Sequence, residues 1–266
     1  MQDVLHLINN ELKLVNQKLQ TIPFLKNNLT NDLKDFITNN SKQIRSIVSL
    51  LYLKAFKENI STKCLDIIAV GEVVHNASLL HDDVIDDAEI RRGITTIATK
   101  FSPKISILAG DYLLSCAINK LLLMNDNRVC QLFLKCTQEM CRAEFEQYFL
   151  REKLPNIETY IKICKGKTAE LFCTILEGCA ILENINIDDT KSFAYNFGIF
   201  FQLKNDLETF SAETDKKNKI FTPKDIFGIE KTLDLIDNYL ERILGDIKKL
   251  PDNDYKKGLE VLITTL

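Results

Sequence analysis

The stretch from Leu79 to Gly93 reads LLHDDVIDDAEIRRG, and it ends a long apolar run of helical periodicity with a burst of charge. Asp82 and Asp86 are four residues apart and share one face of a helix, while Asp83 points about 100° aside. Three carboxylates this close repel one another unless a cation lies among them. Mg²⁺ takes oxygen ligands and keeps waters and phosphate oxygens in its shell. The stretch therefore predicts a helix that ends in a magnesium site.

Two arginines follow these acidic residues. Arg91 and Arg92 come within two helical turns of Asp86, and a guanidinium group matches the geometry of a phosphate. Carboxylates for a metal beside arginines for a phosphate predict a site that holds a diphosphate through Mg²⁺. The alternative is a solvated acidic helix end, which is the usual meaning of a charge cluster.

The whole chain indicates an all-α protein. Of its 266 residues 45% are hydrophobic, and it has nine Gly, five Pro and no Trp, so a single domain over residues 1–266 can bury a sizeable core. Apolar residues recur at helical spacing almost throughout, no hairpin signal such as Asn-Gly is present, and the prolines fall between or at the start of the apolar runs. We predict helices over about residues 2–20, 29–39, 42–58, 62–86, 103–123, 127–151, 157–183, 189–212, 226–249 and 252–265.

Charge and cysteine content narrow the class of protein further. A net charge of −3 argues against a nucleic-acid surface. The cysteines form no CxxC pair and lie in apolar runs, which is typical of free thiols in a reducing compartment. The N-terminus, MQDVLHLI, lacks the basic region of a signal peptide, and no apolar run approaches the length of a membrane span. We therefore expect a cytoplasmic protein with no transmembrane segment and no nucleic-acid partner.

The segment HDDVIDDAEIRRG, residues 81–93, resembles the first aspartate-rich motif of the trans-isoprenyl diphosphate synthases. Further motifs agree with that family, in its order, over about residues 41–225. The resemblance implies a helical bundle around a central cavity (the isoprenoid synthase fold), commonly a homodimer. It implies a Mg²⁺-dependent prenyltransferase that condenses isopentenyl diphosphate with an allylic prenyl diphosphate into a longer trans-polyprenyl diphosphate. Asp82, Asp83 and Asp86 would hold the metal, with Arg91 on the same side.

The resemblance also places a second diphosphate, that of isopentenyl diphosphate, among basic residues. The segment SKQIR, residues 41–45, keeps the lysine and the last arginine of the family motif GKRxR as Lys42 and Arg45, and departs from it at the glycine and the middle arginine. His75 lies two helical turns before the aspartates, where the family has a histidine. Lys42, Arg45, His75 and Arg92 would together bind this substrate.

A third resemblance concerns the allylic substrate. Residues 160–168 match the family segment Y…GKT, in which Lys167 would reach the allylic diphosphate with Thr168 beside it. A P-loop is excluded, because the upstream glycine is missing and no strand precedes the motif. The segment FQLKNDLET, residues 201–209, stands where the family has its second aspartate-rich motif, and there Gln202 and Lys204 would contact the substrate.

That second motif is altered in this chain. Of the expected DDxxD only Asp206 remains, while Asn205 and Thr209 replace the first and third aspartates. An amide oxygen is a neutral and poorer ligand for Mg²⁺ than a carboxylate. The pattern N-D-x-x-T-x-x-x-E also resembles the second metal motif of class I terpene cyclases, in which Asn205, Thr209 and Glu213 would each offer an oxygen to one Mg²⁺.

Three functions follow from these resemblances. The basic residues argue for a chain-elongating synthase, because a cyclase has no second diphosphate to hold. Asn205 and Thr209 argue for a terpene cyclase. A C-terminal region shorter than the family's argues for a weakly active partner subunit of a heteromeric synthase.

One residue bears on product length. Ala77 precedes Asp82 by five residues, about 7.5 Å along a helix. A prenyl tail pointing away from the metal would pass this position, and in the family a small residue here lets the tail lengthen. The resemblance therefore assigns Ala77 to the wall of the tail's path, although a small residue at a helix contact is an equally good explanation.

Overall fold

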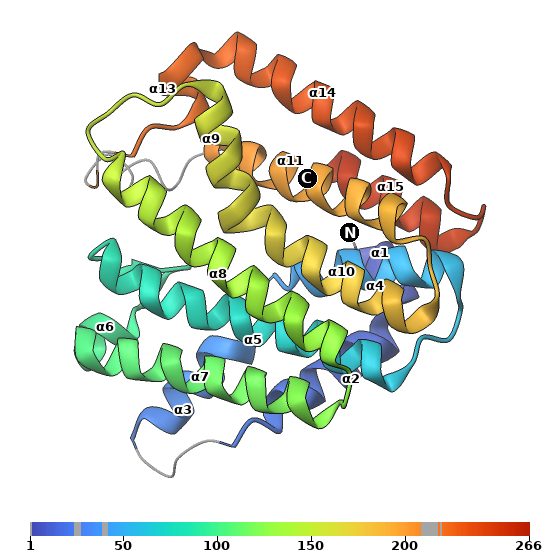
Figure 1. Cartoon of the computed structure of the whole chain (residues 1–266), viewed down its shortest axis with the longest axis horizontal. Coiled ribbons are helices and arrows are strands. Elements are labelled where there is room, and N and C mark those ends of the chain that lie inside the picture. The colour runs from blue at the N-terminus through green and yellow to red at the C-terminus, as the bar shows by residue number, and fades with distance from the viewer. Residues whose placement is uncertain (1, 24–27, 39–41, 209–217, 219) are drawn as a thin grey trace.

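The computed structural model of the chain describes residues 2–23, 28–38, 42–208, 218 and 220–266, and in these ranges the chain forms a bundle of helices with one small hairpin (Figure 1). The elements in chain order are α1 Gln2–Leu7, α2 Asn9–Gln20, α3 Leu29–Thr38, α4 Ile44–Phe56, α5 Thr62–Ile85, β1 Ile90–Arg91, β2 Ile94–Thr95, α6 Ile97–Lys100, α7 Pro103–Leu123, α8 Asn127–Phe149, α9 Ile157–Cys164, the π-helical turn η1 Lys165–Ala169, α10 Glu170–Glu183, α11 Ile187–Glu208, α13 Pro223–Phe227, α14 Ile229–Lys248 and α15 Asp254–Thr265.

The predicted all-α class is confirmed, and most predicted helices match observed ones within two residues. The differences are local. The first predicted helix breaks at Ile8, and the one over 226–249 is α13 and α14, separated by Gly228 with a φ of +86°. The helix over 157–183 contains the π-helical turn η1, and α4 begins at Ile44, two residues later than predicted.

Helix α5 carries the aspartates and lies at the centre of the packing. It begins at a Ser61 cap, whose side chain accepts a hydrogen bond from the Cys64 backbone N–H. It packs against α2, α4, α7 and α10, and in Figure 1 it runs through the bundle beside α7. Because neighbours cover most of its length, almost every residue from Ile67 to Ala77 is buried. The middle of α5 is therefore fixed by its neighbours, and this part of the helix positions the aspartates that follow.

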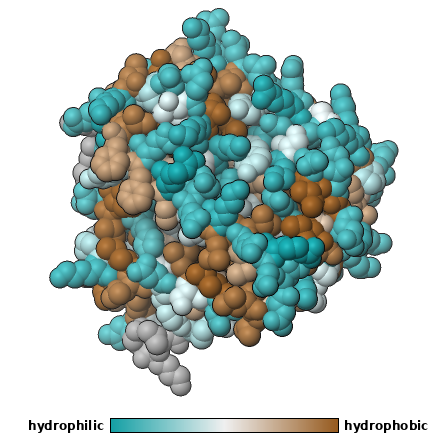
Figure 2. Space-filling view, viewed as in Figure 1, coloured by the Kyte–Doolittle hydropathy of each residue, from teal (hydrophilic) through white to brown (hydrophobic). Residues whose placement is uncertain are grey.

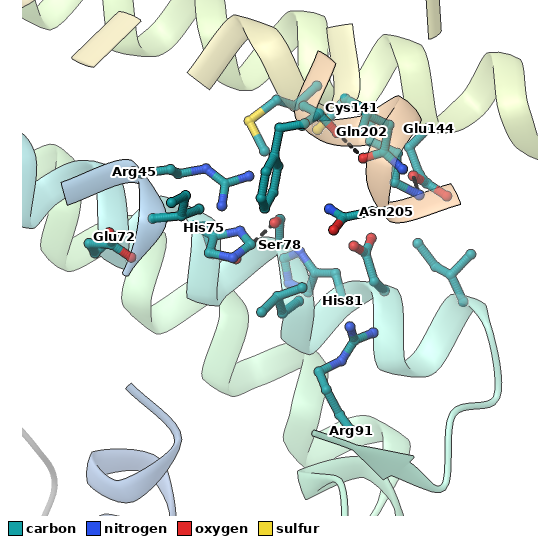
Figure 3. A pocket seen from close by; sticks show the side chains of 18 of the residues that line it. Arg45, Glu72, His75, Ser78, His81, Arg91, Cys141, Glu144, Gln202 and Asn205 are labelled. Carbon is teal, nitrogen blue, oxygen red and sulfur yellow. Dashed lines mark hydrogen bonds and ion pairs between the residues drawn. The ribbon is translucent and has the colours of Figure 1, made fainter. Parts of the chain in front are cut away.

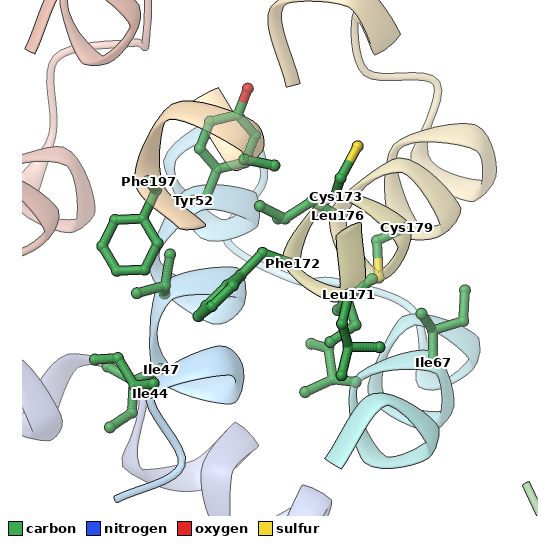
Figure 4. Packing of buried hydrophobic residues seen from close by; sticks show 14 of the residues in the cluster. Ile44, Ile47, Tyr52, Ile67, Leu171, Phe172, Cys173, Leu176, Cys179 and Phe197 are labelled. Carbon is green, nitrogen blue, oxygen red and sulfur yellow. The ribbon is translucent and has the colours of Figure 1, made fainter. Parts of the chain in front are cut away.

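An aromatic cluster joins α4, α10 and α11 behind the site (Figure 4). Tyr52, Phe172, Phe193 and Phe197 are all fully buried. The rings of Tyr52 and Phe193 stack with centroids 4.6 Å apart, and those of Phe172 and Phe197 meet edge-on at 5.1 Å. Aromatic side chains bury large apolar areas, so this cluster fixes α4, which carries Arg45, relative to α11, which carries the second motif.

The hairpin between α5 and α6 was not predicted, because the sequence contains no hairpin signal such as Asn-Gly. Ile90 pairs with Thr95 and Arg91 pairs with Ile94, so the loop has two residues, Arg92 and Gly93. Both have positive φ values, 54° and 78°, as a primed hairpin turn requires. A non-glycine residue with positive φ is uncommon, and Arg-Gly is not the usual signal for such a turn, which is why the sequence did not reveal it.

Two glycines allow η1 to approach its neighbouring helices α8 and α11 unusually closely. A Cβ atom on Gly198 would lie 2.4 Å from the Cα of Ala169, and one on Gly166 would lie 2.8 Å from the Cβ of Ala143. These contacts press η1 against α11 and α8. The side chains of α8, η1 and α11 therefore meet along one wall.

Helix α7 is long and strongly apolar. It is 21 residues long, and its most apolar stretch of 18 residues has a mean hydropathy of 1.4. About a third of that stretch, 33%, is buried. In length and composition it qualifies as a membrane span, so the prediction that no apolar run approaches that length is wrong. It is the one such helix in the described part of the chain, and a single one is weak evidence, because packing helices of soluble proteins have the same composition.

Candidate active site

A cavity of about 1020 Å³ is open between α4, α5, α8, η1, α11 and the hairpin (Figure 3). It brings together predicted site residues that are up to about 160 positions apart in the sequence. Those that line it are Lys42, Arg45, His75, Asp82, Arg91, Arg92, Lys167, Thr168, Gln202 and Asn205.

Other predicted residues lie elsewhere. Those outside the cavity lining are Ala77, Asp83, Asp86, Lys204 and Asp206. Thr209 and Glu213 lie outside the described residues, so the cyclase pattern has only its Asn205 end in the structure.

Asp82 borders the cavity directly. Burial raises the pKa of its carboxyl to about 6, although the positive charge of Lys167 acts against this shift. A carboxylate that burial disfavours in this way gains most from a nearby cation. Asp82 is therefore the natural first ligand for a metal ion in this cavity.

Asp83 and Asp86 are held by arginines at the cavity's edge. The Nε of Arg91 donates a hydrogen bond to Oδ1 of Asp83, whose other oxygen is buried without a partner. Arg151 donates to Oδ1 of Asp86 at 2.7 Å and to the carbonyl oxygen of Ile85, and so caps the end of α5. Arg151 was not predicted, because it lies 65 residues further along the chain and no local pattern marks it.

The end of the cavity near Asp82, Asp83 and Asp86, called the acidic end below, fits a magnesium ion that also binds a phosphate. Within the described ranges, no three acidic, His or Cys side chains are close enough to hold an ion by themselves. Asp82 is nonetheless a carboxylate disfavoured by burial, and Asp83 has an unpartnered buried oxygen. Mg²⁺ characteristically takes one or two carboxylates and completes its shell with waters and substrate phosphates. The donor set therefore suits a magnesium–diphosphate complex.

Lys167 faces these aspartates from the π-helical turn η1. Its Nζ lies 2.6 Å from Oε2 of Glu144 and donates to Oε1 of Gln147 at 2.7 Å. Burial alone would lower the pKa of Lys167, but Asp82 and Glu144 outweigh it and raise the pKa above its ordinary value. The lysine is thus a fixed cation in the cavity. π-Helical turns are frequent at functional sites, and this one directs the Lys167 side chain inward.

Glu144 and Gln147 are functional candidates that the sequence analysis missed. They are three residues apart on α8 and so share one face, yet such a polar pair is common on any half-exposed helix. Glu144 also lines the cavity. Only the fold shows that both side chains converge on Lys167.

A chain of hydrogen bonds organises the second motif. Thr168 donates to Oε1 of Gln202 at 2.7 Å, and Nε2 of Gln202 donates to Oδ1 of Asp206 at 2.8 Å. Tyr160 donates to the other Asp206 oxygen. Both carboxylate oxygens of Asp206 are therefore engaged within the protein, and it is the neutral Asn205 that faces the cavity.

A basic cluster forms the opposite end of the cavity. Arg45 is buried, its guanidinium carbon lies 4.8 Å from the centroid of the Phe172 ring, and its Nε has no hydrogen-bond partner. Burial lowers the pKa of Arg45 to about 10, and burial together with the neighbouring Arg91 lowers that of Arg92. Lys42 is exposed at the rim. Cations crowded in this way, with an unpartnered buried N–H on Arg45, are suited to an anion.

His75 lies within this basic cluster. Burial, and then Arg45 and Arg92, lower its pKa well below the ordinary value. The imidazole is therefore neutral near pH 7 and offers one N–H donor to a ligand.

Ser78, rather than Ala77, lines the cavity on the side of α5 that faces the substrate space. Ala77 is fully buried on another side of the helix. Five residues place it about 140° around the helix from Asp82, whereas four residues place Ser78 only about 40° from it. The prediction for Ala77 rested on its distance along the helix and ignored this rotation.

Comparison with known proteins agrees with this geometry. The polyprenyl synthetase family model matches residues 26–240. The chain is 27% identical over 251 residues to a prenyl transferase from Cyanophora paradoxa, covering 88% of this chain and 77% of that relative.

Solved structures are similar over nearly the whole chain. Heptaprenyl diphosphate synthase from Staphylococcus aureus has a TM-score of 0.85 and 25% identity, with 97% of each chain covered. Geranyltransferase from Helicobacter pylori, in complex with magnesium and isoprenyl diphosphate, has a TM-score of 0.80 and 19% identity, with 98% and 97% covered. The chain therefore belongs to the polyprenyl synthetase family and is a trans-prenyltransferase of the prenyl diphosphate synthase class.

Proposed function

We propose that the cavity binds two diphosphates at its two ends and joins the prenyl groups between them. The observation that carries this proposal is the separation of charge within one cavity. Asp82 and Lys167 form one end, and Arg45, His75 and Arg92 form the other. The first end suits a diphosphate bound through a metal, and the second suits a diphosphate bound by cations alone.

The allylic prenyl diphosphate belongs at the acidic end. Mg²⁺ held by Asp82 and Asp86, once Arg151 releases Asp86, would supply charge that stabilises the departing diphosphate. Lys167 and Arg91 add fixed positive charge where negative charge develops on the leaving oxygen. The allylic C–O bond breaks, and the electron pair leaves with the diphosphate.

The lining between the two ends protects the resulting allylic cation. Leu79, Met140, Phe145 and Phe201 contribute apolar surface to the cavity. An apolar wall keeps water, which would quench the cation, away from the reacting carbon.

Isopentenyl diphosphate belongs at the basic end. Lys42, Arg45, His75 and Arg92 would hold its diphosphate, so that its double bond faces the cation. A new carbon–carbon bond forms as the double bond attacks, and a proton is then lost, with the released diphosphate as its acceptor. A cyclase would have no ligand for this cluster, which is why we favour chain elongation.

The product's tail would extend from the allylic end along α5. Ser78 is small and lines the cavity one turn before Asp82. It therefore leaves room for a chain to lengthen in this direction, and we propose that the product is longer than its allylic primer by more than one isoprene unit.

We also propose that the protein is a soluble homodimer joined through α7 and α8. These helices expose apolar side chains that lie outside the cavity and that nothing in the described chain covers: Ile107, Leu108, Ile118, Leu122, Leu123 and Leu134. Figure 2 shows brown patches on the face where α7 and α8 run. Apolar patches of this kind mark interfaces, and a second copy would cover them without a membrane.

A product assay tests the proposed function. Purified protein is incubated with Mg²⁺ and labelled farnesyl diphosphate, with and without isopentenyl diphosphate. We expect longer prenyl diphosphates only when isopentenyl diphosphate is present. Hydrocarbons or alcohols made from farnesyl diphosphate alone would instead identify a cyclase, and turnover that appears only after a partner protein is added would identify a subunit of a heteromeric synthase.

A further inference from the structure

Glu72 is a buried carboxylate that reaches from α5 to the first turn of α4. Its side chain is 1% exposed. Its Oε1 accepts hydrogen bonds from the backbone N–H of Ser46 at 3.1 Å and from the Ser46 hydroxyl at 2.6 Å. A helix start leaves its first N–H groups without intrahelical partners, so Glu72 satisfies one of them from another helix.

Helix α4 has no cap of its own. Gln43 occupies the capping position with a left-handed backbone, φ 47° and ψ 35°, and its side chain makes no capping hydrogen bond. The first turn of α4 also contains no acidic residue. Glu72 therefore supplies both the hydrogen-bond acceptor and the negative charge that stabilise a helix N-terminus.

This first turn carries Arg45, one of the cations of the basic end. Arg45 immediately precedes Ser46, and Glu72 lies three residues before His75 on α5, about one helical turn away. Glu72 also lines the cavity, and Figure 3 shows it beside His75 at the end where Arg45 lies. A shift of the α4 start would move the Arg45 guanidinium relative to any bound anion.

We propose that Glu72 is a positioning residue for isopentenyl diphosphate. It anchors the first turn of α4 and so holds Arg45 in the orientation that the diphosphate requires. Its own carboxylate has no hydrogen-bond donor to offer the substrate. This inference rests on the proposed placement of isopentenyl diphosphate at the basic end. A carboxylate next to an anion site repels the anion. The positioning role explains why a carboxylate is nevertheless found there.

The chain offers a matched control in Glu183. This residue of α10 is also buried, and its Oε1 accepts from the backbone N–H of Ser61, at the start of α5, at 2.9 Å. Its other oxygen accepts from Lys57 at 2.9 Å. Glu183 does not line the cavity. It anchors a helix start in the same manner as Glu72, but away from the diphosphate cations.

The test compares Glu72→Ala and Glu183→Ala by titration calorimetry and steady-state kinetics. Loss of a helix cap corresponds to roughly a tenfold change in an equilibrium constant, so Glu72→Ala should raise the Kd and KM for isopentenyl diphosphate about tenfold. The KM for the allylic substrate should stay within about twofold. Glu183→Ala should lower Tm similarly but leave both constants unchanged.

Two further variants separate positioning from general damage. Glu72→Gln keeps an acceptor oxygen at the same reach and should restore most of the affinity. Ser46→Ala removes only the hydroxyl bond and should raise the Kd for isopentenyl diphosphate about threefold. If Glu72→Ala fails to fold, Ser46→Ala decides the question.

The inference is overturned if folded Glu72→Ala, or Ser46→Ala, binds isopentenyl diphosphate as the wild type does, or if the allylic KM rises equally. Failure of the proposed function has a different signature, because the wild-type protein itself would then not bind or elongate with isopentenyl diphosphate.

Discussion

Asp82, Asp83 and Asp86 share one motif but have three different environments. Asp82 borders the cavity, Asp83 is paired with Arg91, and Asp86 is paired with Arg151. The arginines balance charge that would otherwise destabilise the end of α5. In the complex that we propose, Mg²⁺ would therefore replace Arg151 as the cation at Asp86.

The second motif permits a gain-of-function prediction. Asn205 presents a neutral amide to the cavity, and a carboxylate there would be a stronger Mg²⁺ ligand. Asn205→Asp should lower the Mg²⁺ concentration that gives half-maximal activity about fivefold or more. Magnesium titrations of the wild type and the variant measure this directly, with Lys204→Gln as a neighbour outside the cavity lining. An unchanged or higher Mg²⁺ requirement would show that this side does not approach the metal.

A second prediction concerns product length. Ser78→Phe should shorten the products, because a large ring at this position would block the tail one turn from Asp82. Ala77→Phe is the control: Ala77 is fully buried, so the added ring should lower the free energy of unfolding by about 1–3 kcal/mol through overpacking. Chromatography of the products and urea unfolding give the two readouts. Shorter products from folded Ala77→Phe but not from Ser78→Phe would reverse the assignment.

At the scale of elements, the site depends on how closely helices approach around η1. Lys167 and Thr168 reach the cavity because this turn is π-helical and packs tightly against α8 and α11. Gly198 makes that packing possible, since a side chain there would collide with the backbone of Ala169.

Gly198→Ala should therefore impair both stability and turnover. The added methyl group would push η1 from α11, and we expect a loss of about 2 kcal/mol in unfolding free energy and at least about tenfold in kcat. Gly245→Ala in α14 is the matched control, because a Cβ atom added there would meet nothing within 4 Å. That substitution should stabilise the protein by up to about 1 kcal/mol. Equal effects of the two substitutions would contradict the packing explanation.

Glu183, which anchors the start of α5, should make the free energy of unfolding depend on pH. Burial alone would raise the pKa of Glu183, but hydrogen bonds from Lys57 and Ser61 outweigh it and lower the pKa from 4.5 to about 2. A carboxyl whose pKa is lowered by folding stabilises the folded state fully above its unfolded pKa, and this contribution is lost as pH falls from about 4.5 to about 2.

Glu183→Gln should therefore cost about 2 kcal/mol of unfolding free energy near pH 7, and distinctly less near pH 3. Urea unfolding of wild type and variant across this range measures the difference. A difference independent of pH would show that the carboxylate's charge does not contribute.

At the scale of the whole molecule, motif order in the sequence was enough to predict the fold class, the family and the meeting of distant segments in one cavity. Helix boundaries followed from apolar periodicity and from the positions of the prolines. The sequence did not reveal the direction in which Ala77 points, the distant partner of Asp86, or the hairpin that turns Arg91 back toward Asp83. Each of these depends on rotation about a helix or on contacts between remote segments, which local patterns do not encode.

The proposed homodimer gives a prediction at the same scale. Leu108 is 62% exposed on α7, and an aspartate there would place a charge within an apolar interface. Leu108→Asp should shift the protein from dimer to monomer in light scattering coupled to size exclusion. Val261→Asp, which changes an exposed apolar residue of α15, should leave the mass unchanged. A wild-type monomer, or a Leu108→Asp dimer of unchanged affinity, would exclude this face as the interface.

The most direct measurement of the central claim is a crystal structure with Mg²⁺ and a non-reactive thio analogue of farnesyl diphosphate. We predict magnesium between the diphosphate and the carboxylates of Asp82 and Asp86, Lys167 on the diphosphate, and the tail passing Ser78. A structure in which the analogue binds elsewhere, with Asp86 still paired to Arg151 and no ion at Asp82, would contradict it.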